Sequence, residues 1–360
     1  MKIVTVIGAR PQFIKAAAVS RIIREEYSSE VEEIILHTGQ HYDVNMSDVF
    51  FDEMEIPKPH YRFNINGVNH GAMTGQMMEK IEEVLLSEKP DCVLVYGDTN
   101  STLAGALAAK KLHVKLAHVE AGLRSFNMKM PEEINRIVAD RISDFLFCPT
   151  KKAISNLHIE GFDKFDCNVL HSGDVMLDAA LFYSQISSEK SKIINELSLE
   201  EYVLATFHRA ENTDNENSLA NIVNGLNHIN TEIPVIVPVH PRTRKKISDF
   251  NLKVNFKLIN PLGYFDMIEL IKNSKLVLTD SGGLQKEAFF FKKISVTMRE
   301  ETEWVELVEN GFNILSGSNS EKIYNSYLKA INMNPDFSLN LYGKGNASSL
   351  IVNELLKRLS

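Results

Sequence analysis

The sequence has few cysteines, and their placement excludes two common uses of this residue. Cys92, Cys148 and Cys167 are odd in number and widely spaced. This fits buried thiols in a reducing compartment better than a disulfide framework or a zinc site. No run of about 18 apolar residues occurs, and the N-terminus lacks the basic region and cleavage site of a signal peptide. We therefore expect a cytoplasmic protein without a membrane span.

An excess of positive charge is also absent. The formal net charge is −8, so no global basic field would attract nucleic acid or an anionic membrane, and any phosphate must be bound by local cations. The chain has 360 residues, 44% of them hydrophobic, and this length exceeds what one hydrophobic core usually serves. Two α/β domains with a cleft between them are the natural expectation.

Short β-branched runs alternate with amphipathic stretches in two series, which predicts repeated βαβ units. Each series is therefore expected to form a Rossmann-like domain, with a parallel sheet covered by helices. The predicted strands are residues 3–7, 34–37, 92–96, 115–119 and 145–148 in the first series, and 202–206, 235–239, 256–259, 276–279 and 294–297 in the second.

A polar, charged segment separates the two series and sets the domain limits. We assign residues 1–170 to the first domain and 171–346 to the second, with the hinge somewhere in 169–200. The last helix, about residues 347–359 of the segment 347–360, has apolar residues at helical spacing. This spacing allows it to pack back on the first domain.

The first strand runs into the motif GARPQFIK at residues 8–15. A turn and a helix N-terminus thus follow the carboxyl end of a strand, where open α/β sheets bind ligands. Only one glycine of the dinucleotide fingerprint is present, which disfavours a nicotinamide enzyme. Arg10 and Lys15 bracket the turn and suit a negatively charged group, although an ordinary surface turn would also explain them.

A second strand end carries TDSGGLQKE at residues 279–287. Ser281, Gly282 and Gly283 open a helix there, so that backbone N–H groups can meet phosphate oxygens. Glu287, one turn further, is placed to accept hydrogen bonds from ribose hydroxyls. The alternative is a Ser N-cap with a Glu that complements the helix dipole.

Acidic groups follow strands of the first domain, and basic groups follow strands of the second. A carboxylate wall that faces a cationic wall is what acid/base chemistry on a phosphorylated sugar needs. Solvated loop charges and satisfied histidines are the alternative for any single residue. The acidic group is Asp98, Glu120 and the pair Glu132–Glu133, and the basic group is His208, Arg209 and His240.

Taken together, these motifs resemble the non-hydrolysing UDP-N-acetylglucosamine 2-epimerases over nearly the whole chain. The motifs, in order, are GARPQFIK, TGQH, YGDTN, HVEAGLRS, MPEEINR, TFHR, VHPRTR and TDSGGLQKEA. The resemblance implies a glycosyltransferase-B-like fold, a homodimer, a UDP-sugar substrate, and no redox cofactor or metal. It assigns acid/base roles to Asp98, Glu120, Glu132 and His208, and UDP or substrate contacts to Arg10, Lys15, Arg209, His240, Ser281, Gly282, Gly283, Glu287 and Arg299.

The implied reaction eliminates UDP to give a 2-acetamidoglycal and then adds UDP back with the C2 proton on the other face. A hydrolysing epimerase, a glycosyltransferase of the same fold and a non-catalytic nucleotide-sugar sensor are the rival functions. Hydrolysing epimerases resemble the opening motif less. The several carboxylates count against the other two rivals, because a glycosyltransferase needs only one base.

Some motifs depart from those of enzymes that act on UDP-N-acetylglucosamine, which usually read GTRPE and QEEA and have a longer stretch before the paired glutamates. Polar positions of substrate-activated members are not matched at Asp43 or around Asn69 and His70. The variants FNMKMPEEINR, QKEAFFF and MREETEWVELV look most like the branch that epimerises UDP-2,3-diacetamido-2,3-dideoxyglucuronate to its manno form, for O-antigen or capsule synthesis. UDP-N-acetylglucosamine is the alternative substrate. A uronate adds a carboxylate that needs a cation. Gln12 in place of Glu removes one like charge, and Lys286 or Lys129 adds a positive one.

Overall fold

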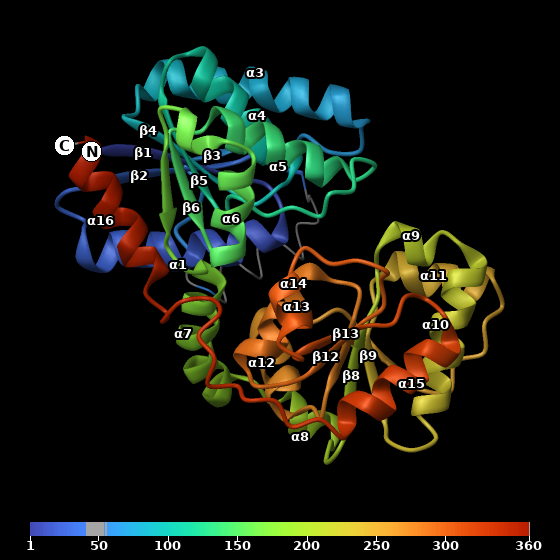
Figure 1. Ribbon diagram of the computed structural model, residues 1–360. Coiled ribbons are helices and arrows are strands. Elements are labelled where there is room, and N and C mark those ends of the chain that lie inside the picture. The colour runs from blue at the N-terminus through green and yellow to red at the C-terminus, as the bar shows by residue number, and fades with distance from the viewer. Residues whose placement is uncertain (41–53, 55, 360) are drawn as a thin grey trace. The chain divides into compact units, whose positions relative to one another are not determined.

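The computed structural model describes residues 1–40, 54 and 56–359. The chain divides into two compact units, unit 1 from Met1–Phe182 with Asn340–Ser360 and unit 2 from Tyr183–Leu339. Each unit has one β-sheet flanked by helices (Figure 1). The two predicted Rossmann-like domains are thereby confirmed. Among the described residues, no helix is long and apolar enough to cross a membrane.

The sheet of unit 1 is parallel throughout its described strands, in the order β3-β2-β1-β4-β5-β6-β7. The chain order reverses at β1, and open α/β sheets bind ligands outside the carboxyl ends of strands at such a switch point. The strands are β1 Lys2–Ile7, β2 Glu32–His37, β3 Tyr61–Arg62, β4 Cys92–Tyr96, β5 Lys115–Val119, β6 Phe145–Cys148 and β7 Asn168–His171.

The helices of unit 1 pack closely on this sheet because the contact residues are small or aliphatic. In α4, a Cβ at Gly105 would lie 3.0 Å from the Val95 side chain of β4, so the helix and the strand approach closely. The C-terminal helix α16 lies beside α1 (Figure 1). The helices are α1 Arg10–Glu26, α3 His70–Glu88, α4 Asn100–Lys111, α5 Pro131–Ile142, α6 Lys151–Ile159, the 3₁₀ turn Phe162–Lys164, α7 Val175–Lys190 and α16 Ala347–Leu359.

The division between the units falls inside α7, after Phe182, which is within the range 169–200 given for the hinge and beyond the domain limit assigned at residue 170. The first turns of α7 are tied to the C-terminal segment of unit 1. The carboxylate of Asp178 accepts hydrogen bonds from the N–H groups of Ala347 and Ser348 (3.1 and 2.7 Å). These two N–H groups belong to the first turn of α16, which has no earlier helical carbonyls to bond. The start of α7 therefore caps α16 and belongs with unit 1.

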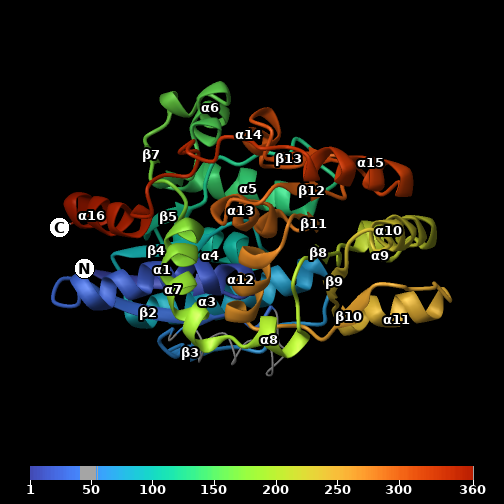
Figure 2. The same ribbon diagram turned by 90° about the horizontal axis from the view of Figure 1, so that it is seen from below.

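Unit 2 repeats the same architecture, with parallel strands in the order β10-β9-β8-β11-β12-β13 (Figure 2). Aliphatic side chains of α10 and α15 form the core on one face of the sheet, and those of α12 and α13 form it on the other. The elements are α8 Ile193–Leu197, β8 Val203–Thr206, α9 Ala210–Thr213, α10 Glu216–Ile229, β9 Val235–Pro238, α11 Pro241–Asp249, β10 Lys257–Ile259, α12 Tyr264–Asn273, β11 Val277–Thr279, α13 Gly282–Phe290, β12 Ser295–Thr297, α14 Val305–Glu309, β13 Asn313–Leu315 and α15 Ser320–Ile331.

All predicted strands occur, and β4, β5 and β6 match the prediction at both ends. The sequence analysis missed β3, β7 and β13, which the structure places at sheet edges.

Candidate active site

The turn after β1 is held by the side chain of Gln12. Its Oε1 accepts hydrogen bonds from the N–H groups of Gly8 and Ala9 (2.8 and 3.1 Å). Its Nε2 donates to the carbonyl of Tyr96 and to Oγ1 of Thr102 (2.8 and 3.0 Å). Gln12 is 1% exposed, so it ties the turns after β1 and β4 together and belongs to the scaffold rather than to a sugar pocket.

The first helix brings two predicted site residues to this edge of the sheet. Arg10 is the first residue of α1 and is partly exposed. Lys15 lies deeper, at 6% exposure, and its Nζ donates to Oε2 of the buried Glu120. A Cβ at Gly97 would lie 3.1 Å from both atoms of this ion pair. The structure thus pairs Lys15, which was expected at a phosphate, with one of the predicted acid/base carboxylates.

Asp98 and Glu120 follow the neighbouring strands β4 and β5. Glu120 has a φ of 72°, which is a left-handed conformation. This conformation is unfavourable for residues other than Gly and persists only where surrounding contacts hold it. The side chain of Asp98 is 34% exposed and accepts a hydrogen bond from Nη1 of Arg136 (3.0 Å). Asn135 donates to the backbone carbonyl of Asp98 (2.8 Å). The two carboxylates therefore have different environments, one enclosed and one open.

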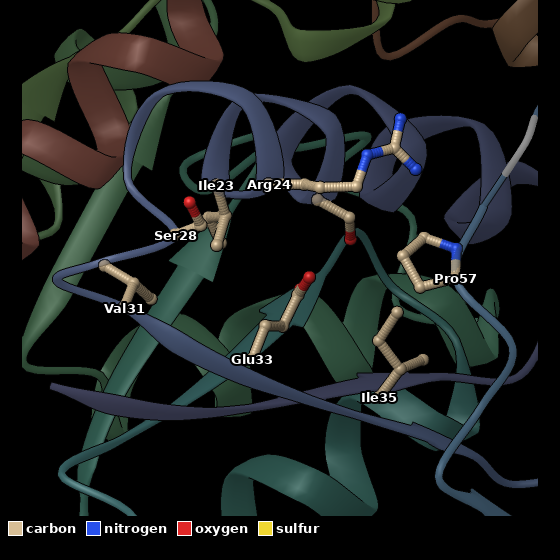
Figure 3. Close-up of a pocket in the computed structure, with 8 residues that line it drawn as sticks. Ile23, Arg24, Ser28, Val31, Glu33, Ile35 and Pro57 are labelled. Atoms are coloured by element: carbon tan, nitrogen blue, oxygen red, sulfur yellow. The ribbon is translucent and has the colours of Figure 1, made fainter.

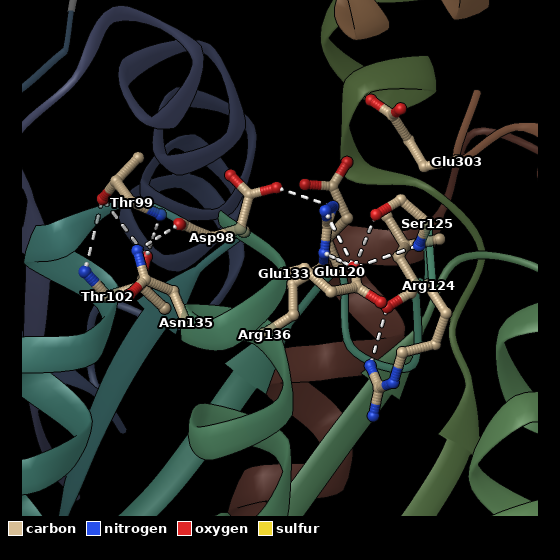
Figure 4. Close-up of polar contacts among 12 residues, drawn as sticks. Asp98, Thr99, Thr102, Glu120, Arg124, Ser125, Glu133, Asn135, Arg136 and Glu303 are labelled. Atoms are coloured by element: carbon tan, nitrogen blue, oxygen red, sulfur yellow. Dashed lines mark hydrogen bonds and ion pairs between the residues drawn. The ribbon is translucent and has the colours of Figure 1, made fainter. Parts of the chain in front are cut away.

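The paired glutamates at the start of α5 also differ. Glu132 is exposed, whereas Glu133 is 0% exposed. The carboxylate of Glu133 accepts hydrogen bonds from N and Oγ of Ser125 (both 3.0 Å), from N of Phe126 (2.9 Å) and from Nε of Arg136 (3.1 Å). Figure 4 shows Arg136 with Asp98 on one side and Glu133 on the other. Glu133 is a structural anchor, and Glu132 is the member of the pair that solvent can reach.

In unit 2, His208 and Arg209 follow β8 and are held by Asp280, which follows the adjacent β11. The fully buried carboxylate of Asp280 accepts hydrogen bonds from the backbone N–H groups of His208 and Arg209 (both 3.0 Å) and from Nδ2 of Asn212 (3.1 Å). The side chain of His208 remains 56% exposed. Asp280 was not singled out from the sequence, although it stands beside Ser281 in a motif that was.

Ser281 precedes α13, and Gly282 and Gly283 open it, as predicted. Ser281 occupies the N-cap position but makes no side-chain capping hydrogen bond, so the simple N-cap alternative does not explain it. A Cβ at Gly282 would overlap the carboxylate of Glu303. Glu303 accepts a hydrogen bond from Nη1 of Arg299 (3.0 Å), and Nη2 of Arg209 lies 4.0 Å from it. An anionic group thus already lies against the residues predicted to meet a phosphate.

The other candidates lie in different surroundings. His240 is exposed, and its Nδ1 accepts a hydrogen bond from N of Arg242 (3.3 Å), so it caps α11. Glu287 is 6% exposed. Lys286 is 0% exposed, with Nζ 4.1 Å from the centre of the Trp304 ring, which makes a cation–π contact. Lys129 is exposed. Of the two lysines considered for a uronate, only Lys129 is open to solvent.

A separate cavity of about 180 Å³ lies in unit 1 among α1, the chain before β2 and the start of β2 (Figure 3). Ser20, Arg24, Ser28 and Glu33 supply its polar groups. Burial raises the pKa of the Glu33 carboxyl, and this outweighs its hydrogen bond from Thr5. The cavity contains none of the predicted site residues. In the described part of the chain, no group of three His, Cys, Asp or Glu side chains is placed to hold a metal ion.

A comparison with known protein families identifies the family to which the chain belongs. The family model described as UDP-N-acetylglucosamine 2-epimerase matches residues 24–356 of the chain. The chain belongs to the UDP-N-acetylglucosamine 2-epimerase family. It is therefore an isomerase, as the motifs indicated.

Relatives with names and solved structures agree with this family. The UDP-2,3-diacetamido-2,3-dideoxy-D-glucuronate 2-epimerase of Pseudomonas aeruginosa is 55% identical, over 99% of this chain and 100% of its own. A UDP-N-acetylglucosamine 2-epimerase homolog of Methanococcus maripaludis is 54% identical over 100% of both chains. The crystal structure of the Methanocaldococcus jannaschii UDP-GlcNAc 2-epimerase, in complex with UDP-GlcNAc and UDP, matches with a TM-score of 0.92 and 42% identity, over 99% of this chain and 100% of that one.

Several residues that build this epimerase-family site were missed by the sequence analysis. Asp280 and Arg136 hold predicted site residues in place but contribute no exposed group of their own, and Glu133, which was named with the acidic group, has the same supporting role. The phase of α5 was an available signal, since Glu133 and Arg136 are three residues apart and share a helix face. The motif TGQH lies partly beyond the described residues, since His41 is outside them, and so does Asp43.

Proposed function

We propose that this chain inverts C2 of a UDP-linked 2-acetamido sugar without oxidation. Asp98, Glu120 and Glu132 act as acid/base groups together with His208. The UDP moiety is bound by the residues at the start of α13, namely Ser281, Gly282 and Gly283, with Glu287 on the ribose and with Arg10, Arg209, His240 and Arg299 as further contacts. Lys15 forms an ion pair with Glu120.

The chemistry explains why several carboxylates are useful. C2 carries no adjacent carbonyl, so its hydrogen becomes acidic only as the C1–O bond to UDP breaks and positive charge develops at C1. The electron pair of that bond leaves with the diphosphate, a carboxylate takes the C2 proton, and a 2-acetamidoglycal remains. UDP then adds back to C1 while an acid delivers a proton to the opposite face of C2. Cations around the diphosphate stabilise the leaving charge.

The observation that carries the proposal is the set of three acidic side chains at one sheet edge of unit 1. They differ in environment, because Glu120 is buried against Lys15, Asp98 is partly open beside Arg136, and Glu132 is exposed. Two faces of a sugar ring need two differently placed acid/base groups. The carboxylate of Glu303 beside Arg299 and Gly282 supports an anion site at the start of α13.

For the substrate we propose UDP-2,3-diacetamido-2,3-dideoxyglucuronate, converted to its manno epimer for O-antigen or capsule synthesis. The named relative from Pseudomonas aeruginosa, at 55% identity, supports this choice. UDP-N-acetylglucosamine is the second candidate, since UDP-N-acetylglucosamine 2-epimerases of two archaea are each 44% identical to this chain. Lys129 is our candidate partner for the uronate carboxylate. A homodimer and a cytoplasmic location remain predictions from the sequence.

Proton NMR in deuterated water tests the reaction and the substrate together. We expect a new manno anomeric signal, with deuterium at C2, from the uronate and not from UDP-N-acetylglucosamine. Turnover of UDP-N-acetylglucosamine alone would instead select the second candidate. Free UDP and reducing sugar as main products would indicate a hydrolysing epimerase, and no exchange at C2 with either substrate would refute the proposal for these sugars.

Matched variants test the assigned groups. Asp98→Asn and Glu120→Gln should abolish C2 exchange and leave UDP binding intact. Glu26→Gln, which alters an exposed carboxylate at the end of α1, should change neither. If Asp98→Asn and Glu120→Gln keep turning over as Glu26→Gln does, these two carboxylates are not the acid/base groups.

A further inference from the structure

A buried hydrogen-bonded pair lies beneath the turns that carry Asp98 and Glu120. His118 of β5 is 0% exposed, and both of its ring nitrogens lie 2.7 Å from oxygen atoms. Nδ1 faces Oδ1 of Asp140 in α5, and Nε2 faces the backbone carbonyl of Gly97. A carbonyl oxygen only accepts hydrogen bonds, so Nε2 must carry a hydrogen.

The other oxygen of Asp140 ties the pair to a second segment of the chain. Its Oδ2 accepts hydrogen bonds from Nη1 of Arg124 (2.6 Å) and from N of Gly122 (3.1 Å). Burial opposes ionisation of Asp140, but the hydrogen bond and charge of His118 and the charge of Arg124 outweigh it and lower its pKa. Both ring nitrogens of His118 are thus engaged, Nε2 by the Gly97 carbonyl and Nδ1 by the carboxyl group of Asp140.

This network touches the chain on both sides of the proposed acid/base groups. Gly97 directly precedes Asp98, and Gly122 comes two residues after Glu120. Gly97, Glu120 and Gly122 all have a left-handed backbone conformation, with φ of 61°, 72° and 80° respectively. A residue other than Gly is strained in a left-handed conformation and keeps it only where surrounding contacts hold it. The hydrogen bonds of His118 to Gly97 and of Asp140 to Gly122 supply such contacts.

We propose that the buried His118–Asp140 pair is a positioning device that fixes the turns carrying Asp98 and Glu120 for proton transfer. The inference rests on the proposed function. His118 is a positioning residue and not a catalytic one, because it is fully buried and acts only through the backbone of Gly97 and the side chain of Asp140. If the pair served stability alone, substituting it would leave the geometry of the two turns unchanged in the folded protein.

The test compares this pair with an exposed one in the same unit. His118→Gln removes the imidazole, and Asp140→Asn keeps the shape of the partner but removes its charge. The control is His158→Gln in α6, where the His158 side chain is 71% exposed and pairs with Asp163. For the two buried variants we expect kcat to fall by about 10²-fold, as small misplacements of reacting groups cause, while KM and the Kd for UDP stay unchanged. The control should match the wild type.

Folded buried variants that retain the wild-type kcat would overturn the inference, and so would a loss of UDP binding that parallels the loss of kcat. A second measurement needs no variant. Nitrogen-15 NMR of the unaltered protein should show a hydrogen on Nε2 of His118, as its bond to the Gly97 carbonyl requires, and a bare Nε2 would refute the assignment. If the wild type exchanges no C2 proton on either UDP sugar, the proposed function fails first. If the wild type is active and His118→Gln equally so, only the positioning role fails.

Discussion

The adjacent residues Glu132 and Glu133 offer a sharp test, because the structure gives them opposite roles. Glu133 accepts four hydrogen bonds while fully buried. In Glu133→Gln, the amide oxygen can replace one carboxylate oxygen, but the NH₂ group must then face a donor. At least one hydrogen bond to a charged group is lost, worth about 1.5–3 kcal/mol, and one buried donor is left unsatisfied, at a cost of about 1–3 kcal/mol.

Together these terms predict a loss of about 3–5 kcal/mol in the free energy of unfolding. For a unit of this size, 1 kcal/mol corresponds to roughly 2–4 °C in Tm, so Tm should fall by about 6–20 °C. Glu132→Gln loses only an exposed charge at a helix N-terminus, worth about 0.3–1 kcal/mol. Its Tm should therefore stay near that of the wild type, while C2 exchange is lost.

Thermal unfolding followed by circular dichroism, and amide hydrogen exchange in β4 and β5, measure the stability of unit 1 for both variants. C2 deuterium exchange on the preferred UDP sugar measures the chemistry. Equal Tm values for the two variants would refute the reasoning about Glu133. A fully active Glu132→Gln would remove Glu132 from the acid/base group.

Three further predictions concern unit 1. Gly122→Ala should lower the free energy of unfolding by about 1–3 kcal/mol in urea titrations, because its φ is 80° and the new Cβ would clash with a backbone carbonyl of α6. Burial opposes ionisation of Asp144, but hydrogen bonds from two lysines and a backbone amide outweigh it and lower its pKa. This stabilisation is present above the unfolded-state pKa of about 3.9 and is lost as pH falls through the folded-state pKa. The urea midpoint should thus fall more steeply below about pH 4 in the wild type than in Asp144→Asn. Burial raises the thiol pKa of Cys92, Cys148 and Cys167. A thiol reagent should therefore label only the partly exposed Cys167 before unfolding. Rapid labelling of all three thiols would contradict their burial.

The central strands were predictable because a parallel strand covered on both faces appears in the sequence as an unbroken apolar run. β4, with sequence CVLVY, is buried at every position, and its ends were predicted correctly. The three missed strands lie at sheet edges and are short. β3 has two residues, neither of them buried, and β7 has no buried residue. One neighbour and partial solvent exposure leave too weak a hydrophobic pattern for such strands to be recognised.

The sequence motifs located the candidate site but did not separate the groups that meet a substrate from those that support them. The sequence analysis considered a role at the sugar for Gln12. The hydrogen bonds of its side chain to the turns after β1 and β4 instead make it part of the scaffold. Lys286 was considered for the same reason and is buried against Trp304. Both depend on partners far away in the chain, which no local pattern reveals.

The helix α5 shows which local signal was nevertheless present. Glu133, Arg136 and Asp140 are spaced at i, i+3 and i+7, so they share one face of the helix. Ordinarily such a charged face points to solvent, yet here it is buried, while Ile134 on another face is 44% exposed. Burying three charged side chains costs more than apolar packing unless each is paired, and each is paired with a segment next to Asp98 or Glu120. A helix with this inverted pattern is therefore built to hold those two carboxylates in place, at an expense that stability alone would not require.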